Sequence, residues 1–500
     1  MRATEKATSV AIVGAGFGGI GLGIRLEQAG IESFTILEKA DGVGGVWRDN
    51  TYPGLTCDIP SLLYSFSFEP NHEWSHRFAR QPEILAYLER CVDKHGLGDR
   101  LRLGTEVRAA RFDSESGKWR IELDGADPIE AHVLVTATGQ LSRPAYPSIA
   151  GLRHFGGKLF HSARWDHGYD LAGKRVGVLG TGATAIQFVP EIAPRVERLD
   201  LFQRSAPWVV PKPDRPYGPR ERSLYRRAPW IKALGRAWVH LFYELMTLGL
   251  TRLQWLQRPF ERAYDRRLRE EVSDPELRAR LRPDYPFGCK RILLSNEWLA
   301  TLTRPNVEVV SEAITEIVPD GVVMGNGGVR ELDAIILATG FASRDFLAPM
   351  AVTGIDGVDL NAAWREGAEA YLGLAVSGFP NMFMLYGPNT NLGAGSVVYM
   401  LESQIGYVVG AVLELQRNGA RYLDVRRDVH DRFSAEMQRR LAGTVWTAGC
   451  SNWYVTESGK VTNNWPGVAF EYKRRTRRFR IADYRVAQPL IESSAGARSV

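Results

Sequence analysis

Two glycine-rich turns, opening at Gly14 and Gly180, constrain the fold of this 500-residue chain more than any other feature. Each turn follows a short, β-branched apolar run, residues 9–13 and 175–179, and each leads into a helix-like stretch. Such runs are typical of buried parallel strands. A strand, a G-x-G-x-x-G/A turn and a helix make a dinucleotide-binding βα unit, with the pyrophosphate at the helix N-terminus. The sequence therefore predicts an α/β protein with two Rossmann-like units.

The first unit has every part of this pattern in order. Its motif positions are Gly14, Gly16 and Gly19, with Phe17 among them. The next strand-like run, residues 33–37, ends on Glu38, about 20 residues further on, where a carboxylate can hold ribose hydroxyls. A lone glycine motif is a weak signal, but this succession strongly indicates dinucleotide binding.

The second unit ends differently. Its motif positions are Gly180, Gly182 and Ala185, and the strand-like run 198–202 leads into Gln203-Arg204-Ser205 in place of an acid. A carboxylate there would repel a 2′-phosphate, whereas the Arg204 guanidinium and the Ser205 hydroxyl can donate to it. We therefore predict a preference for NADPH over NADH, with two further nucleotide contacts at the start of the helix, Thr184 and Gln187.

A third pattern, F-x-G-x-x-x-H-x-x-x-W-D, lies between the two turns. Its fixed positions are Phe155, Gly157, His161, Trp165 and Asp166. The residues alone would also fit a linker whose histidine and aromatic rings merely pack. The pattern resembles the fingerprint of the FAD- and NADPH-dependent Baeyer–Villiger monooxygenases, and the resemblance extends from Gly14 to about Gly467. Enzymes of that family insert one oxygen atom of O2 beside a carbonyl, which turns ketones into esters or lactones.

The resemblance also implies where the flavin lies. Residues 42–68 are rich in Gly, Pro and aromatic residues, and by composition alone they could form a packed loop without a ligand. They are similar to the flavin-covering loop of that family, and the turn at residues 387–393 is similar to one that faces the flavin. The flavin contacts implied in this way are Gly45, Val46, Trp47, Asp58, Tyr64, Val107 and Val397.

Oxygen insertion by such an enzyme needs a flavin C4a-peroxide that stays anionic and away from water. A guanidinium suits this task because it stays charged in any plausible environment. A Lys-Arg pair such as Lys290-Arg291 is by itself most often solvated surface. The resemblance implies instead that Lys290 joins Arg204 and Ser205 on the 2′-phosphate, and that Arg291 reaches the peroxide with Asp58 as its ion partner. It further implies that His161 and Trp165 act in domain arrangement and reduction, and that Trp465 folds over the nicotinamide cofactor.

The predicted domains are discontinuous. The flavin domain takes residues 1–143 and 341–500, and the NADPH domain takes 144–206 and 289–340. Residues 207–288 interrupt the α/β rhythm and are predicted to form a helical insert. We expect its aromatic side chains to be core residues: Trp230, Trp238, Phe242, Tyr243 and Trp255.

Composition excludes several other functions. A net charge of +6 over 500 residues, without an aromatic-interleaved basic stripe, argues against a nucleic-acid partner. The most apolar helix-like run, residues 238–250, falls short of the ~18 apolar residues of a membrane span, so no integral membrane association is expected. Four scattered cysteines form neither a zinc pattern nor a C-x-x-C pair, and their low number fits a reducing cytoplasm.

The resemblance implies a small ketone and O2 as partners, and we expect a monomer or small homo-oligomer. Two other functions stay open. An N- or S-oxygenating flavin-containing monooxygenase has a related fingerprint. A pyridine-nucleotide–disulfide oxidoreductase also has two Rossmann units, but this chain lacks the C-x-x-C pair of that class.

Overall fold

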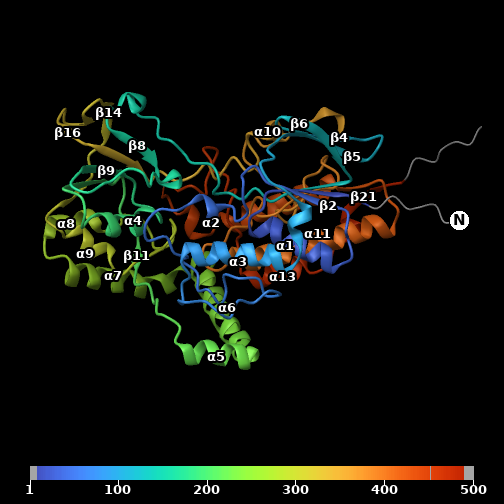
Figure 1. Cartoon of the computed structure of the whole chain (residues 1–500), viewed down its shortest axis with the longest axis horizontal. Coiled ribbons are helices and arrows are strands. Elements are labelled where there is room, and N and C mark those ends of the chain that lie inside the picture. The colour runs from blue at the N-terminus through green and yellow to red at the C-terminus, as the bar shows by residue number, and fades with distance from the viewer. Residues whose placement is uncertain (1–7, 451, 489–500) are drawn as a thin grey trace, which may run out of the picture.

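The computed structural model describes residues 8–450 and 452–488, and two five-stranded parallel sheets form its framework (Figure 1). The first sheet has the order β19-β7-β1-β2-β3. Its strands are β1 (Val10–Val13), β2 (Phe34–Leu37), β3 (Leu101–Arg102), β7 (Val133–Thr136) and β19 (Met382–Met384). β1, between β2 and β7, is buried along its whole length, as expected for a strand covered on both faces.

The second sheet has the order β13-β10-β9-β17-β8. Its strands are β8 (Lys158–His161), β9 (Arg175–Leu179), β10 (Arg198–Phe202), β13 (Val307–Val310) and β17 (Ala334–Leu337). β9, β10 and β13 have the bounds that their apolar runs predict, because each run stops at a polar or glycine-containing turn. The prediction of two parallel α/β units is confirmed.

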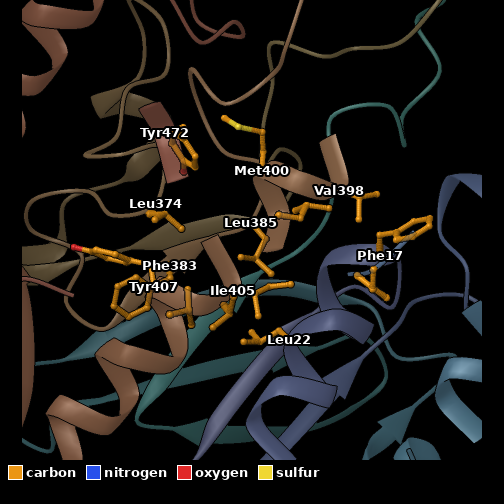
Figure 2. Packing of buried hydrophobic residues seen from close by; sticks show 14 of the residues in the cluster. Phe17, Leu22, Leu374, Phe383, Leu385, Val398, Met400, Ile405, Tyr407 and Tyr472 are labelled. Carbon is orange, nitrogen blue, oxygen red and sulfur yellow. The ribbon is translucent and has the colours of Figure 1, made fainter. Parts of the chain in front are cut away.

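A long helix, α11 (Val397–Arg417), holds the largest apolar core together. It packs against α1 (Phe17–Gln28) on one side and α13 (Ala469–Thr476) on another. Figure 2 shows Val398, Met400, Ile405 and Tyr407 in this core, with Leu22, Phe383 and Leu385 beside them. Among the described residues α11 is the one helix long and apolar enough to cross a bilayer, but half of that stretch is buried inside the protein. It is accordingly a core helix.

The remaining elements are smaller sheets and helices around the two frameworks. The four-stranded sheet β18-β4-β5-β6 comprises Ala351–Thr353, Val107–Asp113, Lys118–Leu123 and Ala126–Ala131. The sheet β14-β15-β16 comprises Ile314–Val318, Gly321–Met324 and Val329–Glu331, and the pair β20-β21 comprises Tyr422–Val425 and Tyr484–Ala487. The further helices are α2 (Val46–Asp49), α3 (Gln81–Lys94), α4 (Ala185–Ile192), α9 (Trp298–Leu302), α10 (Leu360–Ala363) and α12 (Arg427–Leu441).

Four α-helices follow β10 and precede α9: α5 (Pro219–Arg227), α6 (Pro229–Thr251), α7 (Arg258–Glu271) and α8 (Pro275–Leu281). Two short parallel strands, β11 (Val209–Val210) and β12 (Leu293–Leu294), lie on either side of them. Figure 1 shows α5 and α6 projecting from the lower side of the protein, away from both large sheets.

The expectation that the aromatic residues of this segment form a core is wrong for four of the five. The exposed fractions are 65% for Trp230, 73% for Trp238, 53% for Phe242 and 63% for Trp255. Tyr243 alone is half-buried. Trp230, Trp238 and Phe242 lie on the side of α6 that faces away from the rest of the protein, and Trp255 follows the end of that helix.

The chain crosses between the two sheets twice, after β7 and after β17, and the two crossing segments lie together. The Ala145 N–H donates to the Gly340 carbonyl at 2.9 Å, and the Ala342 N–H donates to the Arg143 carbonyl at 2.9 Å. Pro144 and Phe341 form an antiparallel bridge between these bonds. The outgoing and returning segments therefore form one paired connection.

A substitution in the first glycine turn tests how tightly α1 packs on β1. A Cβ atom on Gly19 would lie 1.9 Å from the Gly14 carbonyl oxygen, so Gly19→Ala must push the helix off the turn. We expect a destabilisation of at least ~1–3 kcal/mol, as for other overpacked sites. The measurement is the thermal unfolding midpoint followed by circular dichroism. Gly98→Ala is the control, because no atom lies within 4 Å of a Cβ at that position. Equal unfolding midpoints for the two variants would contradict the close approach of Gly19 to the Gly14 carbonyl oxygen.

Candidate functional site

A cavity of about 1210 Å³ lies between the carboxyl ends of the two parallel sheets. Its walls include Val13, Leu37 and Ala137 at the ends of three strands of the first sheet. Thr181 and Ala338 mark the ends of two strands of the second. Ligands of open α/β sheets bind at such carboxyl edges. Because a pocket for one drug-sized ligand measures about 300–1,000 Å³, this cavity has room for more than one ligand.

The first glycine turn presents open backbone to the cavity. α1 begins after Gly16 without a side-chain cap and without an acidic residue in its first turn, so its first N–H groups stay available to an anion. Glu38 is buried beside the turn and accepts from the N–H groups of Ala15 at 2.8 Å and Ala40 at 3.0 Å. A Cβ atom on Gly45 would lie 3.2 Å from the Gly16 Cα, so the covering loop approaches the turn closely.

An apolar wall continues from this turn along the cavity. The Trp47 indole N–H donates to the Tyr64 hydroxyl at 3.0 Å, and the Tyr64 ring meets the Phe17 ring edge-on at 5.2 Å. Val46, Val107 and Val397 also line the cavity. These residues come from four segments distant in sequence, and together they form a surface suited to a flat ring system.

The second glycine turn faces a cluster of donors. Arg204, Ser205 and Lys290 all line the cavity, and the Lys290 ammonium donates to the Ser205 hydroxyl at 2.6 Å. Burial, with Arg204 nearby, lowers the pKa of Lys290 below its usual range. Two positive groups without an acid between them form a site for an anion such as a phosphate.

Two further predicted residues connect this cluster to the covering loop. Thr184 lines the cavity before α4, and the side-chain amide oxygen of Gln187 accepts from the Thr56 N–H at 2.7 Å. Gly182 also lines the cavity, and a Cβ there would meet no atom within 4 Å. The loop at residues 42–68 therefore contacts both glycine-rich units.

Arg291 and Asp58 form an ion pair on the cavity wall. The Arg291 Nε and a terminal nitrogen donate to one Asp58 oxygen at 3.0 and 2.5 Å. The side chains are 34% and 30% exposed, and the exposed parts face the cavity. Asp58 raises the pKa of Arg291 further above its usual range, so the guanidinium stays charged. Tyr454 lies close enough to interact with Arg291, and burial raises the pKa of Tyr454 to about 12.

Some predicted site residues lie behind the cavity wall. Gly19, Gly180 and Ala185 do not line it, in keeping with motif positions that let helix and strand pack. Trp465 is fully buried elsewhere: its indole N–H donates to the Val468 carbonyl at 3.2 Å, and the Arg440 guanidinium lies over its ring. A contact between Trp465 and a nicotinamide cofactor stays a prediction, because this structure gives the ring a packing role.

The F-x-G-x-x-x-H-x-x-x-W-D residues lie at the edge strand β8 and do not line the cavity either. A Cβ atom on Gly157 would lie 2.5 Å from the Asp333 carbonyl and 2.7 Å from the Phe155 ring. The Trp165 ring packs between Phe160 and Phe188, and Asp166 pairs with Lys158. These residues join β8 to its neighbours.

His161 connects this segment to the paired crossing. Its Nδ1 accepts from the Ala163 N–H at 3.0 Å, which leaves the ring proton on Nε2, facing the Gly340 backbone. The rings of Tyr146 and Phe341 lie on either side, with centroids 5.6 and 6.0 Å away. Burial lowers the pKa of His161 to about 4. The histidine therefore sits, neutral, where the two sheets are joined.

The sequence reasoning missed Tyr386, Gln140 and Asn391, which also line the cavity. Tyr386 has a φ of +63°, and its hydroxyl donates to the Asn391 side chain at 2.7 Å. The Gln140 amide donates to the Tyr386 carbonyl at 3.0 Å. The glycine-rich turn that begins at Gly387 could have pointed to Tyr386, which directly precedes it.

A disulfide bond that no spacing rule predicts links Cys289 to Cys450. Its two half-cystines are 161 residues apart in sequence, and Cys289 directly precedes Lys290 and Arg291. Cys57 and Cys91 are free and buried. The bond fixes the segment that carries Asn452 and Trp453, two further cavity residues, to the junction that carries Arg291.

Comparisons with known proteins agree on the relatives of this chain. The family model for pyridine nucleotide-disulphide oxidoreductases matches residues 11–218. A Baeyer–Villiger monooxygenase of Pseudomonas aeruginosa is 45% identical over 499 residues, which cover 99% of this chain and 95% of that protein. A Baeyer–Villiger monooxygenase of Streptomyces coelicolor is 45% identical over 492 residues, which cover 98% and 94%.

Solved structures give the same result. A steroid monooxygenase in its oxidized form, bound to NADP, has a TM-score of 0.86 at 31% identity, covering 96% of this chain and 99% of its own. A closed cyclohexanone monooxygenase has a TM-score of 0.86 at 28% identity, with the same coverage. The architecture of the two sheets and the elements around them is therefore shared over nearly the whole chain.

The buried His161 makes a pH-dependent contribution to stability. Its pKa is about 4 in the folded protein and about 6.5 in an unfolded chain, so the unfolded state binds more protons between these values. His161 therefore lowers the free energy of unfolding by about 3 kcal/mol as the pH falls from about 6.5 to about 4. We expect His161→Gln to lack this loss. The free energy of unfolding of the wild type should therefore fall relative to that of the variant on acidification. Denaturant midpoints of both proteins across this range are the measurement, with exposed His154→Gln as the control. A constant difference would contradict a neutral buried histidine.

Proposed function

Because the chain belongs to the Baeyer–Villiger monooxygenase family, we propose that it binds FAD and NADPH and uses O2 to convert a ketone into an ester or lactone. The observation that carries the proposal is the Arg291–Asp58 pair on the wall of a cavity shared by two glycine-rich nucleotide units. Bound FAD supplies hydride acceptance from NADPH and the activation of O2. The protein must orient the reacting molecules, exclude water from the cavity and provide a positive charge.

The residues around the first glycine turn fit FAD. The uncapped N-terminus of α1 would hold the pyrophosphate, and Glu38 the ribose hydroxyls. The Trp47 and Tyr64 rings would enclose the flavin rings and exclude water. The proposed contacts are Gly14, Gly16, Phe17, Glu38, Gly45, Val46, Trp47, Asp58, Tyr64, Val107 and Val397, and Gly19 would let the helix pack behind them.

The residues around the second turn fit NADPH. Arg204, Ser205 and Lys290 would hold the 2′-phosphate, because they are the donors at the end of β10 and no acid stands among them. The N-terminus of α4 would face the pyrophosphate. The further proposed contacts are Gly182, Thr184, Gln187, Arg291 and Trp465, of which Trp465 would have to leave its buried position. Gly180 and Ala185 would act from behind the cavity wall, by letting helix and strand pack.

Arg291 is the proposed catalytic residue. Attack on a carbonyl carbon requires an oxygen that stays negatively charged, and negative charge then develops on the carbonyl oxygen. A charged guanidinium that faces the cavity stabilises both without a proton transfer. Asp58 accepts from two Arg291 nitrogens, so it would act as a positioning residue that fixes the direction of the remaining donors.

The same pair weighs against the two alternatives. N- or S-oxygenation uses a protonated oxygen that acts as an electrophile, and a permanently charged donor favours the anionic form instead. Disulfide reduction needs two cysteines next to the flavin. The free Cys57 and Cys91 lie within the residues matched by that family model, and neither is paired.

We further propose that residues 1–143 and 341–500 form the flavin domain and residues 144–206 and 289–340 the NADPH domain, with 207–288 inserted. The fingerprint residues Phe155, Gly157, His161, Trp165 and Asp166 would then set the arrangement of these domains. The two segments that join them are the paired crossings at Ala145 and Gly340.

We place the protein in the cytoplasm as a monomer or small homo-oligomer. Four cysteines in 500 residues fit a reducing compartment. The Cys289–Cys450 bond is the observation that weighs against this location, because disulfides are rare there.

Nucleotide choice tests the second site. Arg204→Ala removes a charged hydrogen bond to the 2′-phosphate, which costs about 1.5–3 kcal/mol. We expect the KM for NADPH to rise by about one to two decades and the KM for NADH to change little. The measurement is steady-state kinetics with both nucleotides. Arg153→Ala, at an exposed position that does not line the cavity, is the control. An equal rise for both nucleotides would show that Arg204 is structural.

Arg291→Ala tests the chemistry itself. Hydride transfer needs flavin and nicotinamide in contact, whereas ester formation also needs the cation. Losing a donor of this kind raises the free-energy barrier of ester formation by about 2.7–4 kcal/mol. We expect NADPH oxidation and O2 uptake to continue while ester falls by about 10²–10³-fold and the electrons leave as hydrogen peroxide. Asp58→Ala should show a milder loss.

Lys290→Ala is the matched control, since it removes the neighbouring cation. It should raise the KM for NADPH but keep the ratio of ester formed to NADPH oxidised. Ester, peroxide and NADPH are measured in the same samples. If Arg291→Ala forms ester at the parent ratio, another cation carries out the reaction.

A further inference from the structure

The outward side of α6 is apolar. At about 100° per residue, six large side chains fall within a sector of about 120° of the helix. All are between 49% and 73% exposed, and they are Trp230, Leu234, Trp238, Leu241, Phe242 and Leu245. We call this set the α6 face. It is about 24 Å long at a rise of 1.5 Å per residue.

The inward side of the same helix carries its two cations. Lys232 is buried, and its ammonium donates to the Asn71 carbonyl. Arg236 donates to the carbonyls of Leu62 at 2.8 Å and Ser65 at 2.9 Å. Burial lowers the pKa of Lys232 to about 8. A surface helix in water has the opposite arrangement, with its apolar stripe toward the core. α6 is therefore built for an apolar environment on its outer side.

Exposed apolar residues continue past the ends of α6. They are Leu224 in α5, Leu253, Trp255 and Phe260 after α6, and Phe470 in α13. The Phe470 N–H donates to the Glu244 carboxylate at 3.1 Å, so the start of α13 lies against α6. Monomeric soluble proteins rarely expose contiguous apolar patches larger than a few hundred Å² unless the patch binds a partner.

The chain around the α6 face is strongly basic. From Arg215 to Arg258 it contains nine Lys or Arg residues and two Asp or Glu residues, in a protein whose total net charge is +6. The exposed cations next to the apolar residues are Arg226, Arg227, Arg252 and Arg258. Trp, Phe and Leu beside an Arg-rich rim form the pattern of helices that lie in the interface of an anionic membrane.

We propose that the α6 face docks on the surface of an anionic lipid bilayer, with its rings among the acyl chains and headgroups and the flanking arginines on lipid phosphates. The helix would lie flat, because Lys232 and Arg236 hold its inner side to the protein. A second copy of the chain fits this surface less well, because a two-fold axis would bring two basic clusters together. Lipid phosphate neutralises the cluster instead.

The inner side of α6 also borders the cavity. The Thr247 hydroxyl donates to the Ala394 carbonyl at 3.1 Å, and the Leu250 side chain lies against Gly288 and Gly393. The adjacent Leu392 and Gly395 line the cavity. Docking would therefore place the cavity one helix away from the bilayer, which would favour ketones that dissolve in lipid. That consequence rests on the proposed function, whereas the docking itself does not.

The test is flotation of the FAD-loaded full-length protein with vesicles of phosphatidylcholine alone and with vesicles that also contain phosphatidylglycerol. We expect binding to the anionic vesicles to be at least about tenfold stronger. Binding should weaken as salt rises from about 0.05 to 0.5 M, because the Debye length shortens. Equal binding to both lipids, or none to the anionic vesicles, would overturn the proposal.

Variants test the basic residues and the apolar residues of this surface separately. Arg226→Gln with Arg227→Gln should weaken binding about fivefold for each charge removed. Arg111→Gln with Arg120→Gln, exposed on the distant strands β4 and β5, should leave it unchanged (Figure 1). Leu234→Ser with Trp238→Ser should abolish binding, while Val329→Ser, exposed on β16, should not.

Tryptophan fluorescence tests which residues enter the bilayer, a separate question from how strongly a variant binds. Brominated lipids should quench the tryptophan fluorescence of the bound wild-type protein, and Trp230→Phe with Trp238→Phe should remove most of that quenching while the protein still binds. Unchanged quenching would overturn the proposal. So would a concentration-dependent dimer that the Leu234→Ser, Trp238→Ser variant dissociates, because a second copy would then cover the α6 face. Flavin content and thermal midpoint of each variant verify that it is folded.

Discussion

Parallel strands end at one edge of their sheet, and in this protein two such edges face the same cavity. The site follows from that constraint. Glu38 and Arg204 each follow the second strand of a βα unit, so the topology brings an acid to one half of the cavity and a cation to the other. Asp58 and Arg291 are 233 residues apart and meet because the covering loop and the end of the insert both enter the gap between the sheets. The ion pair depends on how the sheets face each other and not on any local sequence.

The sequence predicts the parts of this arrangement that local chemistry determines. Runs such as residues 175–179 and 307–310 are strands because β-branched apolar residues favour a buried parallel sheet, and their ends coincide with a glycine or polar turn. The glycine motifs then fix which ends face a ligand. Twelve consecutive residues, 155–166, were enough to indicate the family, although none of the five fixed positions lines the cavity.

What the sequence does not predict depends on distant partners. Periodicity finds an apolar stripe on α6, but it does not show which side of the helix meets the protein, so Trp230 and Trp238 were expected in a core and are exposed. Cys289 and Cys450 are brought together by the fold alone. Trp465 is fully buried beside Tyr472, with the Arg440 and Arg475 guanidinium groups over its ring, and no local pattern predicts this packing. In each case the deciding neighbour is far away in the chain.

The paired crossings between the sheets have a mechanical consequence. Gly139 and Gly340 lie in the two segments with φ of +70° and +83°, and a Cβ atom on either would meet nothing within 4 Å. The two peptide connections alone would let the sheets turn about the line through them. The Cys289–Cys450 disulfide is a third covalent link between the same two parts of the chain, so the angle between the sheets is held at three points while that bond is intact. Reduction of the bond would leave the two crossings, beside His161, as the remaining covalent joints.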